Sequence, residues 1–378
     1  GGRTFNYIAS VKALDDNSVE VTTSAPRPIF PNQLAAMYLV PPKAWADMGI
    51  EGFSNEPIGS GPYQPTRWAA ETIDLEAFEG SWRKPNIKKL RFLRLTDEAA
   101  RVQALVSDQV DIIIQVSVDN IPIIEKAGGT VDAAPSPLIL SLGLVLNNPA
   151  DGVDIQPLLD RRVRQALNYA VNKEAINENL MGGVMGLNSQ LSLPIAFGYN
   201  PRLQPYPFDL ARANALMKVA GYPDGFKMVA EVRGFHDVWL QVAQDLSKIG
   251  IEMELRQVPF ADWLQKFLNV KWEGQAFDLT LGVAPELDSI RPMLFQSCRR
   301  TPNYYCNENV MPLIDAADAE FDVDLRRAML HQLMAELRED APVLYVFEQK
   351  DLNAFSRKVR GFKYVNRVIN YNEITFAN

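Results

Sequence analysis

Two stretches of this sequence decide the fold that it predicts. Residues 57–63 read Pro-Ile-Gly-Ser-Gly-Pro-Tyr, a glycine turn stiffened by proline that leads into an extended segment carrying Tyr63 and Trp68. Residues 160–170 read Asp-Arg-Arg-Val-Arg-Gln-Ala-Leu-Asn-Tyr-Ala, where Asp160 stands at the positive end of a helix, the apolar residues recur at helical spacing and the arginines take the other face. Neither stretch looks catalytic, so both indicate architecture.

Strand and helix patterns alternate along the chain. After short strands and turns over 5–45, with a helical piece at 32–37, the expected strands are 63–78, 88–95, 111–114, 138–146, 226–233, 251–258 and 342–347. The expected helices are 97–107, capped by Thr96, then 161–180, 209–219, 237–249, 260–267 and 324–338. This alternation favours α/β lobes with partly parallel sheets.

In this order and at this distance, the two stretches resemble the extracytoplasmic solute-binding proteins of ABC importers, in the family 5 class that carries dipeptides, oligopeptides and nickel. Further matching segments lie almost end to end along the chain, at residues 15–21, 99–112, 208–226 and 339–361. The resemblance implies a two-lobed periplasmic-binding-protein-like α/β fold of class II, cluster C type. Family members carry a longer region before the segment that residues 5–8 resemble, so we expect the amino-terminal part of the larger lobe to be missing.

The expected lobes follow from two crossings, near 144–148 and 342–348. The larger lobe is then discontinuous and comprises residues 1–146 and 346–378, while residues 147–345 form the second lobe as an insertion. A chain of 378 residues exceeds the size at which single cores stop growing, which agrees with two lobes. We expect Trp45, Trp68 and Trp82 to pack the larger lobe; an exposed stack for sugars is the alternative.

Composition excludes several classes of protein. Apolar residues make up 47% and charged residues 22%, as in a globular protein, and the net charge of -8 argues against a nucleic-acid partner. No run of 18 apolar residues exists, so we expect no membrane span. The start of the chain also lacks a basic and apolar secretory leader.

Cys298 and Cys306 are eight residues apart in a segment of polar and turn-forming residues. A disulfide that closes this short loop is the favoured interpretation, and it would imply an oxidising compartment such as the periplasm. Two unpaired thiols are the alternative. A metal pair is disfavoured because neither of the two histidines lies nearby in sequence.

The resemblance also implies a ligand site. In peptide-binding relatives the strand that residues 277–282 match ends in Gly-Trp, and an aspartate shortly after it holds the amino terminus of the ligand. Here Val283 replaces the tryptophan and Glu286 stands at the aspartate position. A glutamate keeps the negative charge, so a ligand ammonium remains a suitable partner. A solvated loop charge is the alternative for Glu286.

Four further residues complete the expected ligand-binding set. Asp288 and Arg291 follow at spacings that suit the cleft, and the fork of Arg291 suits a ligand carboxylate. Gly282 ends the strand, and Asn147 stands at the expected crossing.

The predicted function is that of a substrate-binding component of an ABC transporter. It would capture a small polar solute, in first place a peptide or peptide-like compound, between two lobes and deliver it to a permease in the inner membrane. We expect a monomer without metal or cofactor, in the periplasm or membrane-associated outside the cytoplasm. The alternatives are another solute class (a metal chelate, an opine or an oligosaccharide), or a sensor or enzyme on the same scaffold. No Gly-x-Ser-x-Gly elbow, His-Glu-x-x-His pair or phosphate loop supports an enzyme.

Overall fold

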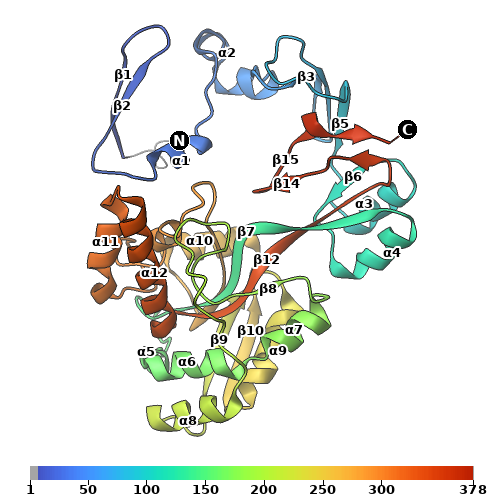
Figure 1. Ribbon diagram of the computed structural model, residues 1–378. Coiled ribbons are helices and arrows are strands. Elements are labelled where there is room, and N and C mark those ends of the chain that lie inside the picture. Colours follow the sequence, from blue (N-terminus) through green and yellow to red (C-terminus); the bar gives the residue numbers. More distant parts are fainter. Residues whose placement is uncertain (1–6, 378) are drawn as a thin grey trace. The chain divides into compact units, whose positions relative to one another are not determined.

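The computed structural model describes residues 7–377 and divides the chain into two compact units (Figure 1). Unit 1 contains the described residues up to Ala35 together with Pro137–Gln349. Unit 2 contains Ala36–Ser136 together with the described residues from Lys350 on. The predicted lobes differ from these units at both crossings and in the place of the residues before Ala36, so that division remains a prediction.

A mixed sheet forms the centre of unit 1, and its outermost strand β6 belongs to unit 2. The strand order is β10 (Ile251–Gln257), β9 (Phe226–Val232), β11 (Ala276–Gly282), β7 (Thr130–Leu144), β12 (Val343–Phe355), β6 (Ile112–Ile114). β9 is parallel to β10 and β11, and β11 is antiparallel to β7. β7 and β12 lie side by side (Figure 1), and each contains residues of both units. Both are longer than predicted, because each continues across the unit boundary.

Helices cover this sheet. They are α5 (Gln156–Leu159), α6 (Arg161–Ala170), α7 (Lys173–Leu180), α8 (Leu210–Ala220), α9 (His236–Ser247), α10 (Phe260–Asn269), α11 (Met311–Ala319) and α12 (Val323–Asp340). The predicted helix 161–180 is two helices, since Val171 is extended and the Asn172 side chain accepts the Ala175 N–H to begin α7. Three smaller elements, β1 (Ile8–Ala13), β2 (Val19–Thr23) and α1 (Phe30–Gln33), precede them, and β8 (Gly186–Leu187) pairs with β12.

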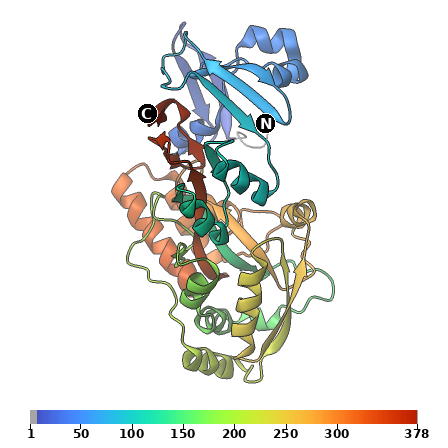
Figure 2. The same ribbon diagram turned by 90° about the vertical axis from the view of Figure 1, so that its right-hand side faces the viewer.

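The strand-helix-strand part β9–α9–β10 forms as predicted (Figure 2). Two glycines permit its parallel pairing, because Gly225 and Gly250 precede the two strands with φ of +76° and +80°. A Cβ on Gly225 would lie 1.9 Å from the Gly250 carbonyl oxygen, so no side chain fits there.

The stretch 160–170 acts through α6. Arg164 is buried, although the sequence pattern predicts it on the exposed face. Its Nη2 donates to Asp340 Oδ1 at 2.6 Å, and its Nε donates to the Asp340 carbonyl. Asn168 donates to the Val343 carbonyl and accepts from the Tyr345 N–H. The helix is thereby fixed to both α12 and β12, which explains why this stretch is characteristic of the fold.

Unit 2 holds the first predicted stretch, residues 57–63. Its elements are α2 (Pro42–Asn55), β3 (Tyr63–Trp68), β4 (Thr72–Ala77), β5 (Lys89–Leu93), α3 (Glu98–Val106), β6, α4 (Ile121–Lys126), β13 (Val359–Arg360), β14 (Tyr364–Val365), β15 (Val368–Ile369) and β16 (Thr375–Phe376). The predicted strand 63–78 is a hairpin, because Ala69 and Thr72 exchange backbone hydrogen bonds in a turn. Asp97, one residue beyond the predicted Thr96, caps α3 through the Ala100 N–H.

The prediction for the three tryptophans is wrong. Trp45, Trp68 and Trp82 are 41%, 47% and 75% exposed, so none of them fills a core. The buried aromatic side chains lie in unit 1 instead, where Trp272 and Phe277 stack with centroids 4.0 Å apart. Within residues 7–377, no helix has the length and apolar character needed to cross a membrane.

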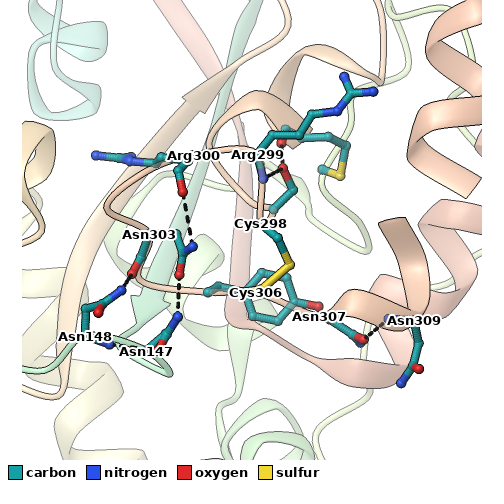
Figure 3. Close-up of a disulfide and its surroundings, with 12 residues drawn as sticks. Asn147, Asn148, Cys298, Arg299, Arg300, Asn303, Cys306, Asn307 and Asn309 are labelled. Carbon is teal, nitrogen blue, oxygen red and sulfur yellow. Dashed lines mark hydrogen bonds between the residues drawn. A yellow bond between two sulfur atoms is a disulfide. The ribbon is translucent and has the colours of Figure 1, made fainter. Parts of the chain in front are cut away.

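The Cys298 and Cys306 sulfurs are bonded, and their loop contacts the end of β7 (Figure 3). Asn303 in the loop accepts from Asn147 Nδ2 at 2.6 Å and, through its carbonyl, from Asn148 Nδ2 at 2.8 Å. The Leu146 and Asn147 N–H groups both donate to the Tyr304 carbonyl. The disulfide therefore closes a loop that holds the chain where it leaves β7.

Lys173 is an unusual buried cation in unit 1. Its Nζ is enclosed near α6 and donates to the carbonyls of Asn168 at 2.7 Å and Tyr206 at 3.4 Å. Burial lowers the pKa of the Lys173 ammonium to about 7, with Glu174 opposing this effect. The folded state therefore favours the neutral amine above neutral pH.

We expect replacement of both cysteines by serine to lower the free energy of unfolding by about 2 to 3 kcal/mol, because the unfolded chain then loses its closed loop. Urea denaturation of the double variant and of reduced wild-type protein measures this loss, and the two should agree. Alkylation of the unreduced protein should find no free thiol. Equal stability of oxidised wild type and double variant would contradict a stabilising role for the bond.

Lys173→Met should change how stability depends on pH. The lysine titrates near pH 10.5 in the unfolded chain and near 7 in the folded one, so between these values the unfolded state binds one more proton. Stability conferred by the neutral form therefore rises with pH above 7 and is flat below it. Relative to the variant, wild type should gain roughly 2 kcal/mol between pH 7 and pH 9 in urea denaturation. Parallel pH profiles would show that the amine is not held neutral.

Candidate ligand-binding site

The candidate site begins where β11 ends. Gly282 stands opposite Leu138 of β7, next to the point at which the chain passes between the units. A Cβ at Gly282 would lie 3.0 Å from Leu138 Cδ2, so the absence of a side chain allows close packing. Gly282 therefore contributes close backbone packing at this end of the sheet.

The turn that follows β11 is held on both sides. The Leu287 N–H donates to the Val283 carbonyl, and Leu287 has φ of +50°, which is rare for a branched residue. Phe197 pairs alongside, because its N–H donates to the Leu287 carbonyl and its carbonyl accepts from Ser289. These bonds fix a left-handed residue between Glu286 and Asp288, and thus set the directions of both side chains.

Glu286 is a buried carboxylate with an incomplete set of partners. It is 8% exposed, and its Oε2 lies 2.8 Å from Arg291 Nε. The N–H of that nitrogen does not point at Oε2, which accepts no hydrogen bond from any residue in the described range 7–377. Arg291 Nη1 donates instead to the Gly282 carbonyl at 2.8 Å. The contact between Glu286 and Arg291 is therefore an electrostatic pair that leaves an acceptor available.

Asp288 has all its partners within unit 1. It is 2% exposed, and both of its oxygens accept from Arg326, at 2.6 and 2.9 Å. Arg326 also donates to the Ala317 carbonyl, and Asp288 Oδ1 accepts from the Ile290 N–H. This bidentate pair attaches the site turn to α12.

Asn147 is not brought to these residues. The ladder pairs Gly282 with Leu138 but Ala276 with Leu144, so Asn147 follows the opposite end of β7. The six residues between Leu138 and Leu144 span roughly 20 Å of extended strand. The sequence-predicted set therefore separates into Gly282, Glu286, Asp288 and Arg291 at one end and Asn147, beside the disulfide loop, at the other.

The structure adds residues that the sequence analysis did not select. Asn32 of α1 donates to the Glu286 carbonyl at 2.8 Å, and Phe30 at the start of α1 packs edge-on against Tyr7. Arg27 lies over the Tyr7 ring at 4.4 Å from its centroid. No motif marks these residues, and their separation of more than 250 positions from Glu286 hides the contact.

Asp278 and Arg233 form a second charged pair near the ends of two parallel strands. Arg233 follows β9, stacks on Trp263 at 3.9 Å and lies 3.3 Å from Asp278 of β11. Burial raises the pKa of the Asp278 carboxyl to about 6, and Arg233 counteracts part of that rise. The place of Arg233 at the carboxyl end of a parallel strand is the signal that could have selected it from sequence.

Comparisons with known proteins agree on one family. Residues 2–288 match the model of the bacterial extracellular solute-binding proteins, family 5. The glutathione-binding protein GsiB of Pectobacterium atrosepticum is 26% identical over 383 aligned positions, covering 95% of this chain and 72% of the relative. The dipeptide-binding protein of Escherichia coli is 26% identical over 384 positions, covering 94% and 69%.

A solved structure shows the same fold. The ABC transporter substrate-binding protein CtaP of Listeria monocytogenes superposes with a TM-score of 0.86 at 18% identity, covering 98% of this chain and 79% of that one. The predicted two-lobed periplasmic-binding-protein fold is thereby confirmed. Since the family model spans most of the sequence, the chain belongs to the bacterial extracellular solute-binding proteins of family 5.

Proposed function

We propose that this protein is the substrate-binding component of an ABC importer and that it captures a small peptide or peptide-like solute. Its family consists of solute-binding proteins, and relatives over nearly its whole length are named for binding glutathione or dipeptides. The protein would deliver its ligand to a membrane permease outside the cytoplasm, without making or breaking a covalent bond.

The observation that carries the peptide assignment is the free acceptor on Glu286. A buried carboxylate oxygen without a hydrogen bond is unfavourable unless a donor arrives. The amino terminus of a peptide is such a donor, and it carries the charge that a carboxylate prefers. A charge-assisted hydrogen bond of this kind contributes about 1.5 to 3 kcal/mol.

The other predicted ligand residues take supporting roles in this proposal. Arg291 orients Glu286 and is anchored on the Gly282 carbonyl, so we assign it to positioning the carboxylate rather than to a ligand carboxylate. Asp288 holds the turn to α12 through Arg326. Asn147 fixes the loop of the disulfide.

Glu286→Gln should weaken binding of a free-amine peptide and remove the preference for a free amine. We expect a loss of about 1 to 3 kcal/mol for Ala-Ala-Gly, because the amide keeps the shape but not the charge. Calorimetry with Ala-Ala-Gly and its N-acetylated form measures the preference in wild type and variant.

Glu254→Gln is the matched control, since Glu254 is an exposed glutamate that also pairs with an arginine, Arg256. It should leave both affinities unchanged. Equal wild-type affinity for the free and acetylated peptides would refute the role of Glu286, and binding of neither would refute the peptide assignment.

A further inference from the structure

A chain of contacts in unit 1 leads from Glu286 to a second cation. Asn32 donates to the Glu286 carbonyl, and it belongs to α1, which begins at Phe30. The Phe30 N–H donates to the Arg27 carbonyl at 3.1 Å, and the Phe30 ring lies 6.2 Å from that of Tyr7. The guanidinium of Arg27 covers the other part of this cluster, at 4.4 Å from the Tyr7 centroid.

Arg27 has no acidic partner in the described part of the chain. Its Nε is buried and makes no hydrogen bond, and no carboxylate of residues 7–377 lies within ion-pair distance of it. A guanidinium presents five donors, and a ring face below the plane satisfies none of them. A cation packed in this way lacks a planar acceptor, and a carboxylate has the matching geometry.

The charges around Glu286 are unbalanced. Asp288 is neutralised by Arg326, so it offers nothing to Arg27. Glu286 shares its charge with Arg291. Tyr7 lies within electrostatic reach of both groups: burial raises the pKa of its phenol, Arg27 lowers it and Glu286 raises it, so the phenol adds no negative charge at neutral pH. Two guanidiniums, those of Arg27 and Arg291, thus face one carboxylate.

We infer that Arg27 binds a carboxylate on the first residue of the ligand, close to the amine that Glu286 takes. The preferred solute is then a peptide whose first residue carries an acidic group besides its amino group. That group is either the side-chain carboxylate of an α-linked glutamyl peptide or the main-chain carboxylate of a γ-linked one. This inference rests on the proposed function and adds the acidic character of the substrate.

Three synthetic tripeptides test the assignment by calorimetry on the whole chain: Glu-Ala-Gly, its γ-linked isomer, and Gln-Ala-Gly. Wild type should bind at least one glutamyl isomer roughly ten- to hundred-fold more tightly than Gln-Ala-Gly, as a charge-assisted pair provides. The isomer that binds more tightly identifies the source of the carboxylate. Arg27→Gln should abolish this preference while leaving the affinity for Gln-Ala-Gly unchanged, which also shows that the variant is folded.

Arg83→Gln is the matched control, because Arg83 covers the Trp82 ring at the same 4.4 Å but lies in unit 2. It should keep the wild-type preference. Equal wild-type affinity for all three peptides, or a preference that survives in Arg27→Gln, would overturn the role of Arg27 and leave the peptide function standing. Binding of none of the three would overturn the proposed function itself and this inference with it.

Discussion

The antiparallel register between β7 and β11 constrains the rest of unit 1. Because Gly282 stands opposite Leu138, β11 ends beside the residues at which β7 passes from one unit to the other. The missing side chain of Gly282 allows this approach, and its carbonyl receives Arg291. A slip of one residue would turn every side chain of β11 to the opposite face and move Glu286 with it. The candidate site is therefore a consequence of strand pairing.

Buried polar groups separate the structural part of the site from the part open to a ligand. Asp288 and Arg326 satisfy one another in a bidentate pair, which is the condition under which a buried ion pair is tolerated. Glu286 Oε2 and Arg27 Nε are buried without a hydrogen bond, and they carry opposite charges. Unmade bonds of this kind cost stability, so a protein retains them where another molecule completes them.

The sequence predicted most elements because they carry local signals. The part from β9 to β10 forms nearly as expected, since its glycines and apolar periods lie within each element. Helix 161–180 was predicted as one because Val171 and Asn172 fit a helical pattern, while the capping bond of Asn172 decides otherwise. Tertiary context also overrides the exposed face predicted for Arg164, which is buried against Asp340.

The site was only partly predictable for the same reason. Glu286, Asp288 and Arg291 follow a recognisable strand, and they do lie together at its end. Which of them is already neutralised depends on Arg326, thirty-eight positions away from Asp288, and no pattern reveals that pairing. Arg27 and Asn32 meet Glu286 only through the fold of a separate segment.

The pairing of Glu286 with Arg291 has a consequence for selectivity. An ammonium that approaches Glu286 meets a carboxylate already half compensated by a guanidinium, so the attraction is weaker than toward an isolated charge. A ligand with only an amine would also place its positive charge near Arg291 and Arg27. A ligand that brings a carboxylate beside its amine meets complementary charge at both groups. An excess of guanidinium around a single glutamate therefore favours zwitterionic and acidic ends over simple amines.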